Sequence, residues 1–320
     1  MARPRERRWD HPEYLNPFQV PRDPLSQVMD QLRLSNLFAS VMRARPPFSR
    51  PANVDGFNVL VVTHGKMYVE PMERPLFPPI LAETGDVVAM PRNMPYRLLY
   101  PLDVSREIES DLIHVKDLSR PRPDELEFLG MICYLDRAHR NLLTDFLPPV
   151  IHLKRSTPGL TRGIKRTVDL FLREHQTLLP GRSTILSRLA ETICVQTLRI
   201  WIQQAPTDEK GWIHGLKDEQ ISLALQAIHR DPGHRWTVAS LARHAGMSRS
   251  VFASRFKELV GESPMVYLSR WRMHRAIGLL EEGTGNLKSV VEASGYRSPT
   301  TFRDAFRRHF GMLPSDYRRQ

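Results

Sequence analysis

Two segments of the sequence carry hydroxyl and basic side chains in the same arrangement, fifty positions apart. They are "SRSVFASRFKELVG" at 248–261 and "SPTTFRDAFRRHFG" at 298–311, with Ser, Phe, Phe and Gly at matching places. On a helical wheel the phenylalanines of each segment fall on one face and most polar residues on the other. Hydroxyl, guanidinium and ammonium groups suit phosphate oxygens and the edges of bases. The spacing therefore predicts two helices, each with an apolar inner face and an outer face able to bind nucleic acid.

The start of each helix and its outer face follow from the same pattern. Ser248 and Ser298 stand where a hydroxyl can cap the first helical turn, and Pro299 suits the first helical position because its φ is fixed near the helical value. The residues that point outward on the wheel are Ser250, Ala253, Ser254 and Lys257 in the first segment and Thr300, Arg303, Asp304 and Arg307 in the second.

A shorter helix before each segment completes a helix-turn-helix pattern. Such a motif needs a small residue where the second helix crosses the first, and a glycine often forms the turn. Ala242 and Gly246 meet these demands in the first copy, and Val291 and Gly295 occupy the matching places in the second. Between the copies, "SPMVYLSRWRMHRAIGLLEEG" predicts a helix of about eighteen residues, or roughly 27 Å. That length suits two recognition helices in successive major grooves about 34 Å apart.

Residues 217–320 resemble the DNA-binding domain of the AraC/XylS family of transcription regulators. The match is carried by "WTVASLARHAGMSRSVFASRFKELVGESPMVYLSRWRM" and "ASGYRSPTTFRDAFRRHFGMLPSDYR". The resemblance implies helix-turn-helix motifs at about 237–260 and 286–310. It implies base-reading positions at Ser250, Ala253, Ser254, Thr300, Thr301, Arg303 and Asp304. Contacts with the DNA backbone are expected from Ser248, Arg249, Lys257, Ser298 and Arg307. Two residues depart from the family pattern, namely Val291, where a small Ala is usual, and Asp304, where many members have a basic residue.

The region upstream of the repeat predicts a different architecture. Short runs rich in Val, Ile, Leu and Tyr, such as "FNVLVVTHGKMYVEP" and "SDLIHVKDL", predict the strands of a barrel or sandwich. Two long amphipathic helices follow, in "LTRGIKRTVDLFLREHQTL" and "STILSRLAETICVQTLRIWIQQ". The region resembles the cupin-like sensor domain found before such modules, through "DPLSQVMDQLRL", "GDVVAMPRNMPYRL" and "DFLPPVIHL". Tyr96 stands where many relatives show His, which argues against a metal or ligand role there.

These patterns together predict an α+β chain. An N-terminal cupin-like β-barrel with helices is followed by an all-α C-terminal domain, in which a long helix joins two helix-turn-helix motifs. The expected parts are a flexible arm at 1–22, a sensor and dimerisation domain at 23–205, a linker at 206–216 and the DNA-binding domain at 217–320. A short helix capped by Asp23 is expected in "DPLSQVMDQLRL".

The composition agrees with an anionic partner in a reducing compartment. The 320 residues carry a formal net charge of +11. Residues 217–320 hold 17 Lys and Arg against 10 Asp and Glu, which is +7 of that charge. Cys133 and Cys194 have neither metal-ligand nor CxxC spacing, so we expect structural thiols and a cytoplasmic protein. No run of eighteen apolar residues occurs, so no membrane partner or export is expected.

Enzymatic chemistry finds little support in the sequence. His64 and His114 lie in strand-like runs, but no HxH with a following Glu forms a cupin-type metal site, and no phosphate loop or GxSxG motif occurs. We therefore expect no catalytic residue, metal or cofactor, and double-stranded DNA as the partner. A small-molecule effector or formation of a homodimer through the N-terminal domain is expected to control the protein, and RNA polymerase is a further partner if it activates transcription. Two alternatives stay open: a cupin-type enzyme fused to a DNA-binding module, and an effector-independent DNA-binding protein.

Overall fold

The computed structural model describes most of the chain from residue 37 onward. The described residues are 25–26, 37–53, 56–72, 76–91, 94–106, 112–115, 119–133, 147–159, 163–204, 211–281 and 287–317. The arm predicted at 1–22 and most of the helix predicted in "DPLSQVMDQLRL" lie outside these residues, as do residues 206–210 of the predicted linker. The described parts are mixed α and β, which confirms the predicted fold class.

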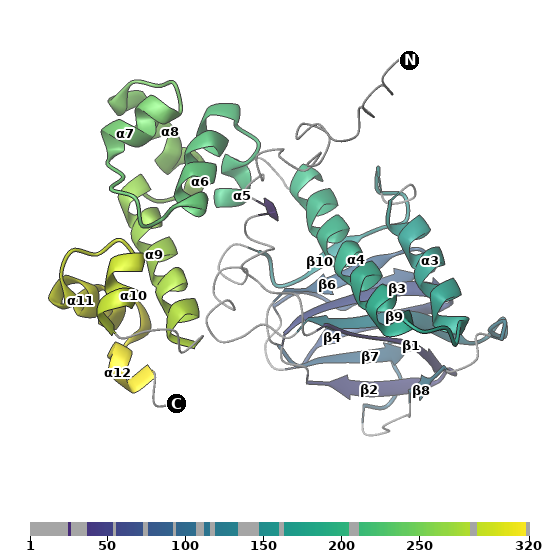
Figure 1. The fold of residues 1–320 in the computed structure, drawn as a ribbon. Coiled ribbons are helices and arrows are strands. Elements are labelled where there is room, and N and C mark those ends of the chain that lie inside the picture. Colours follow the sequence, from purple (N-terminus) through teal and green to yellow (C-terminus); the bar gives the residue numbers. More distant parts are fainter. Residues whose placement is uncertain are drawn as a thin grey trace, which may run out of the picture.

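The N-terminal strands form two antiparallel sheets that lie face to face (Figure 1). The six-stranded sheet has the order β10-β6-β3-β9-β1-β8 and the four-stranded sheet the order β2-β7-β4-β5. The strands are β1 (Leu37–Ala44), β2 (Phe48–Ala52), β3 (Phe57–His64), β4 (Lys66–Pro71), β5 (Ile80–Glu83), β6 (Val87–Met90), β7 (Tyr96–Tyr100), β8 (Ile113–His114), β9 (Leu126–Cys133) and β10 (Ile151–Leu153). The pairing of the described strands thus gives two packed sheets with the cupin-like arrangement.

Strand β3 shows why these runs form a sheet that is covered on both faces. Successive side chains of a strand point to opposite faces. Val59 and Val61 accordingly pack in one hydrophobic cluster, on the outer face of the six-stranded sheet, while Leu60 and Val62 pack in another, between the two sheets. Because both faces are covered, the strand is apolar at nearly every position.

The space between the sheets is filled by apolar side chains. Phe48, Met67, Met90 and Phe128 are all buried there, and Tyr96 joins them with 3% of its surface exposed. Burial raises the pKa of the Tyr96 hydroxyl. At the place where the family resemblance implies His in many relatives, this chain therefore contributes a core side chain.

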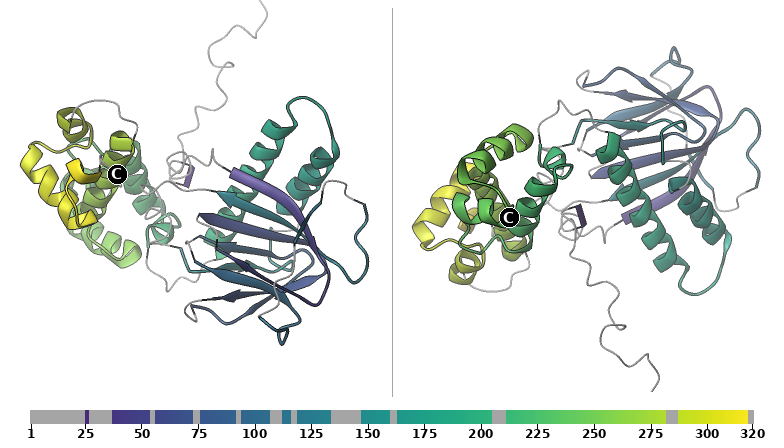
Figure 2. Two further views of the ribbon diagram at one scale, coloured as in Figure 1. Left: turned by 90° about the horizontal axis from the view of Figure 1, so that it is seen from below. Right: turned by 90° about the horizontal axis from the view of Figure 1, so that it is seen from above.

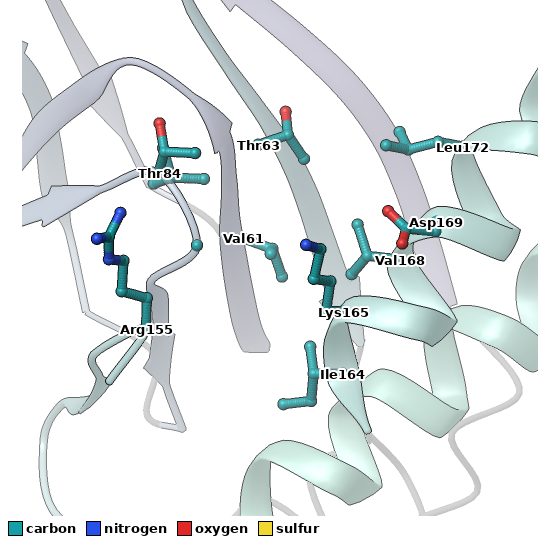
Figure 3. A pocket seen from close by; sticks show the side chains of 11 residues that line it. Val61, Thr63, Thr84, Arg155, Ile164, Lys165, Val168, Asp169 and Leu172 are labelled. Atoms are coloured by element: carbon teal, nitrogen blue, oxygen red, sulfur yellow. The ribbon is translucent and has the colours of Figure 1, made fainter. Parts of the chain in front are cut away.

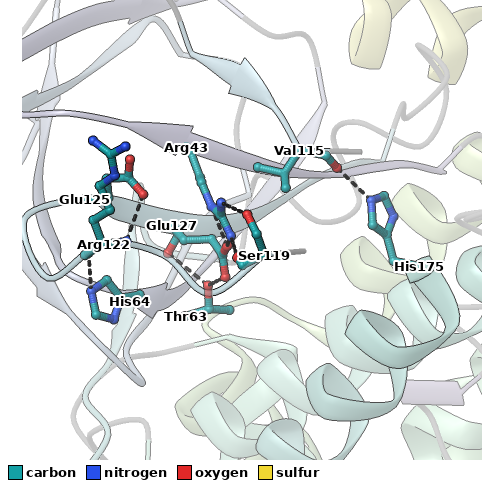
Figure 4. Close-up of polar contacts among 9 residues, drawn as sticks. All are labelled: Arg43, Thr63, His64, Val115, Ser119, Arg122, Glu125, Glu127 and His175. Carbon is teal, nitrogen blue, oxygen red and sulfur yellow. Dashed lines mark hydrogen bonds and ion pairs between the residues drawn. The ribbon is translucent and has the colours of Figure 1, made fainter. Parts of the chain in front are cut away.

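Two long helices cover the outer face of the six-stranded sheet. They are α3 (Ile164–Gln176) and α4 (Arg182–Gln204), which confirms the two amphipathic helices predicted there. Figure 2 shows both helices lying side by side along the strands. The Thr167 hydroxyl of α3 donates a hydrogen bond to the side-chain oxygen of Gln196 in α4 at 3.1 Å. At the other end of α3, the ring of His175 donates to the carbonyl oxygen of Val115 at 2.8 Å (Figure 4).

A buried carboxylate, that of Glu127, lies near one end of strand β9 in the six-stranded sheet (Figure 4). Glu127 of β9 is 6% exposed and pairs with Arg43 of β1 at 2.7 Å. The Thr63 hydroxyl donates to the same carboxylate at 2.9 Å. A buried charge is tolerated only when it is paired and hydrogen-bonded, and both conditions hold here.

The two histidines that were considered as metal ligands, His64 and His114, make other contacts. His64 donates a ring hydrogen bond to the carbonyl oxygen of Arg122 at 3.0 Å (Figure 4), and His114 shares one with the Ser40 hydroxyl at 2.8 Å. Across the described ranges, no three His, Cys, Asp or Glu side chains converge as metal ligands.

The C-terminal part is a set of short helices around one longer one (Figure 1). They are α5 (Trp212–Gly215), α6 (Glu219–Arg230), α7 (Val238–His244), α8 (Arg249–Val260), α9 (Pro264–Glu281), α10 (Leu287–Ala293), α11 (Pro299–Phe310) and α12 (Pro314–Tyr317). Asp218 caps α6, because its carboxylate accepts from the N–H groups of Gln220 and Ile221. Within the part of the chain that the structure describes, no helix combines the length and the apolar content needed to span a bilayer.

Candidate nucleic-acid interface

The first helix-turn-helix unit consists of α7 and α8. Thr237 and Ser240 form a capping box at the start of α7, with each hydroxyl accepting from the other residue's N–H group. Ala242 is 1% exposed, so the small residue lies where the helices meet, and Gly246 forms the turn with φ of +66°. This left-handed conformation favours glycine because it has no Cβ.

Helix α8 is held by its inner face and leaves its outer face exposed. Phe252, Phe256 and Val260 are buried, and Leu259 is half-buried. Ser248 occupies the predicted N-cap position, but its hydroxyl makes no capping hydrogen bond. The predicted contact residues Ser248, Arg249, Ser250, Ser254 and Lys257 are exposed, and Ala253 is half-buried.

Two residues of α8 were not singled out from the sequence. Val251 is 55% exposed, an apolar side chain on the surface of the predicted recognition helix. Placing Val251, the residue after Ser250, on the same helical wheel would have predicted this exposure. Arg255 forms an ion pair with the capping carboxylate Asp218 at 2.5 Å, so this arginine ties α8 to the start of α6.

The second unit, α10 and α11, repeats the first with larger side chains. Val291 is 2% exposed, so the cross-helix position accepts valine in place of the usual alanine. Ser298 caps α11 through its hydroxyl, which accepts from the Thr301 N–H group at 3.2 Å. Phe302 and Phe306 are fully buried. The predicted contact residues Thr300, Thr301, Arg303, Asp304 and Arg307 are exposed, and Ser298 is half-buried.

The outer face of α11 is rich in positive charge. No described acidic side chain forms an ion pair with Arg303 or Arg307, and Asp304 is the acidic residue between them. The contact of Arg303 with its own helix, from Nε to the Pro299 carbonyl oxygen, is long at 3.4 Å. These guanidinium groups are thus available for an anionic partner.

Contacts among the loop before α7, helix α9 and the turn after α10 connect the two units. The Arg272 side chain of α9 donates to the carbonyl oxygens of Pro232 at 2.8 Å and His234 at 2.9 Å, and lies over the ring of Tyr296. Next to this side chain, a Cβ added to Gly295 would be 2.8 Å from the carbonyl oxygen of Gly233, so the two backbones touch. We call this set of residues the interunit junction: Pro232, Gly233, His234, Arg272, Gly295 and Tyr296.

An aromatic cluster contributed by α5, α6 and α9 packs against the first unit. His229 of α6 and Tyr267 of α9 share a buried hydrogen bond of 2.6 Å between Nε2 and the hydroxyl oxygen. The His229 ring stacks on Trp271 with 3.8 Å between ring centroids. Burial raises the pKa of the Tyr267 hydroxyl well above its usual value. Trp212 of α5 contacts the same histidine edge-on, so the end of the predicted linker packs into this domain.

The sequence matches known families over both parts of the chain. A family described as Cupin matches residues 23–203, and a helix-turn-helix domain family matches residues 241–320. A protein of Streptomyces lividans named as an AraC-like transcription regulator is 40% identical over 184 residues, which cover 56% of this chain and 59% of that protein. The chain therefore spans less than two thirds of that relative's length. The transcriptional regulator AlkR of Acinetobacter baylyi is 31% identical over 255 residues, or 75% of this chain and 81% of AlkR.

These matches establish the family. The chain belongs to the AraC-type transcription regulators that carry an N-terminal cupin domain, as the sequence resemblance predicted. Among solved structures, the DNA-binding domain of AdpA in complex with a target DNA is 33% identical over 32% of this chain and 91% of that chain, with a TM-score of 0.30. ToxT from Vibrio cholerae is 11% identical over 89% of this chain and 97% of that chain, with a TM-score of 0.36. The family assignment depends on the sequence matches.

Proposed function

We propose that the protein is a sequence-specific DNA-binding transcription regulator. Helices α8 and α11 enter the major groove on one face of the duplex, one helical turn apart. Their outer residues contact base edges, while the surrounding lysines and arginines neutralise phosphates and supply affinity that depends on salt. The N-terminal domain controls this activity through a small-molecule effector or a homodimer, and the protein works in the cytoplasm without catalysis of its own.

The paired helices support this proposal most strongly. Each has a buried phenylalanine face and an exposed polar face, and both are attached to α9. The 18 residues of α9 span about 27 Å at 1.5 Å each, and the interunit junction holds the two units together. A helix face that only contacts solvent needs no second copy. A protein that reads two successive major grooves requires two such helices.

The test is to separate base reading from general attraction to DNA. The full chain selects binding sites from a pool of random duplexes, and the affinity of Arg303→Ala is then measured on the selected site and on a random duplex. Loss of a bidentate base contact costs about 1–3 kcal/mol, or roughly five-fold to 150-fold on the selected site. A smaller loss is expected on random DNA.

Arg199→Ala is the matched control. Arg199 is exposed on α4, so its substitution removes one charge far along the chain from α8 and α11. Equal losses of Arg303→Ala on both duplexes would contradict base reading by α11. A pool that yields no enriched sequence would favour an effector-independent DNA-binding protein instead.

A further inference from the structure

A cavity of about 440 Å³ lies outside the space between the two sheets, where the six-stranded sheet meets α3 (Figure 3). Its wall comes from β3, the turn between β5 and β6, the loop after β10 and the part of α3 from Ile164 to Leu172. The lining residues used below are Val61, Arg155, Lys165, Val168, Asp169 and Leu172. The volume falls in the range of ordinary small-molecule sites, about 300–1,000 Å³.

The facing walls of this cavity are apolar. Val61 projects from β3, and Val168 and Leu172 project from α3. Val61 and Val168 are each 5% exposed, so they belong to the packed core that the cavity adjoins. A ligand with a hydrocarbon or aromatic body would remove this apolar surface from water, and removal of apolar surface from water favours binding.

Two cationic side chains line the cavity from different segments of the chain. Lys165 reaches from the first turn of α3 toward β3, between Val61 and Val168, and Arg155 rises from the loop after β10 (Figure 3). No ion pair joins either of them to an acidic side chain among the described residues. Two positive groups at one cavity favour an anion, because a charge-assisted hydrogen bond is about twice as strong as a neutral one.

A buried carboxylate fixes the position of Arg155. Asp86 is 5% exposed and accepts from the backbone N–H of Arg155 at 2.7 Å and from the ring of His152 at 3.1 Å. Gly85 has φ of +93°, and a Cβ added to it would be 3.0 Å from the Cβ of Arg155. The Arg155 backbone is therefore held close against the turn between β5 and β6, on the same side of the cavity.

Asp169 limits the charge that the cavity accepts. It lies on α3 one turn after Lys165 and beside Leu172, on the far side from Arg155 (Figure 3). A second negative group on a ligand would meet this carboxylate and be repelled. The cavity thus favours one negative charge at the end near Arg155.

The geometry points to a binding site for a small organic monoanion, with its carboxylate held by the cationic lining residues Arg155 and Lys165 and its apolar body against Val61, Val168 and Leu172. The binding site itself does not depend on the proposed function. Only the statement that its ligand is the effector of the regulator rests on that proposal. The hydrogen bond between Thr167 and Gln196 ties the same part of α3 to α4. Helix α4 ends at Gln204, seven residues before the described C-terminal part resumes at Gly211.

The test uses probes of matched length and different charge. Binding of hexanoate, phenylacetate, 1-hexanol, hexylamine and the dianion adipate to the full chain is measured by titration calorimetry. Hexanoate or phenylacetate is expected to bind at least tenfold more tightly than the alcohol, the amine and adipate. Lys165→Met and Arg155→Met are each expected to weaken carboxylate binding tenfold or more, and Asp169→Asn to strengthen adipate binding.

Arg166→Met is the matched control, because Arg166 is exposed on α3 next to Lys165 and does not line the cavity. Absence of carboxylate binding in the wild-type chain, or equal binding by Lys165→Met and Arg166→Met, would overturn the assignment. Circular dichroism shows whether each variant is folded, and the comparison of probes on the wild-type chain needs no variant.

A separate measurement distinguishes failure of the site assignment from failure of the proposed function. DNA affinity on the selected site is measured with and without hexanoate. If no carboxylate binds but the selected DNA does, the site assignment fails and the regulator function stands. If the carboxylate binds while no DNA sequence is selected, the site stands and the regulator function fails.

Discussion

Replacing Gly295 with alanine will destabilise the C-terminal domain much more than the same change at Gly246. The two glycines are equivalent in the repeat, and both adopt left-handed backbone conformations, with φ of +76° and +66°. Their surroundings differ. A Cβ on Gly246 would meet only the Gln220 amide at 3.9 Å, whereas a Cβ on Gly295 would meet the Gly233 carbonyl oxygen at 2.8 Å and Arg272 Nε at 3.0 Å.

The magnitudes follow from these distances. A left-handed conformation costs an L-residue about 1–2 kcal/mol, and alanine recovers about 0.4–1 kcal/mol by restricting the unfolded chain. We therefore expect Gly246→Ala to lower the free energy of unfolding by about 1 kcal/mol. At Gly295 the overlap with a neighbouring backbone adds about 1–3 kcal/mol, as overpacking does in a core. The expected loss there is about 2–4 kcal/mol.

Urea unfolding of the full chain measures the difference. The transition of the C-terminal domain is followed by tryptophan fluorescence, because Trp212 and Trp271 are buried in it and will become exposed. Equal losses for the two variants would refute the close approach of Gly233 and Gly295. It would also remove the reason to treat the two helix-turn-helix units as one rigid body.

Three further predictions concern other parts of the chain. Tyr267→Phe removes the buried hydrogen bond to His229 and should lower the free energy of unfolding by about 1–3 kcal/mol in urea. Burial raises the pKa of the Cys133 thiol to about 12. Iodoacetamide at pH 8 should therefore label Cys133 over 1,000-fold more slowly than an ordinary cysteine with a pKa of about 8.5. Rapid labelling would contradict the burial of this thiol. Arg106 lowers the pKa of Glu70, so their pairing stabilises the fold above the ordinary carboxyl pKa of about 4.3 and is lost as the pH falls through the lowered value. Because the pair is partly exposed, Glu70→Gln should reduce the acid-induced loss of unfolding free energy by at most about 1 kcal/mol, and an unchanged pH profile would count against the pairing.

The recognition helices were predictable because their signals are local. The inner faces of α8 and α11 follow from phenylalanines four residues apart, and their ends follow from serine and glycine at each terminus. The exposure of Ser250, Arg303 and their neighbours then follows from helical periodicity alone. Their contacts with DNA stay predictions.

The cavity and the interunit junction could not be predicted from the sequence. Val61, Arg155 and Lys165 come from three separated segments, and only the pairing of β3, β6 and β10 brings them together with α3. Gly233 lies in a loop after α6, where a glycine next to a proline indicates only a turn. Its contact with Gly295, sixty-two positions later, depends on how α9 positions both units.

Under the proposed function, the interunit junction would also limit which DNA sites the protein can use. If α8 and α11 belong to one rigid body, the number of base pairs between their contact sites is fixed. One inserted base pair moves the second site by about 3.4 Å and rotates it by about 35°, and five turn it to the opposite side of the duplex. A flexible connection would tolerate such insertions. The close approach of Gly233 and Gly295 would instead hold the two contact sites at one spacing.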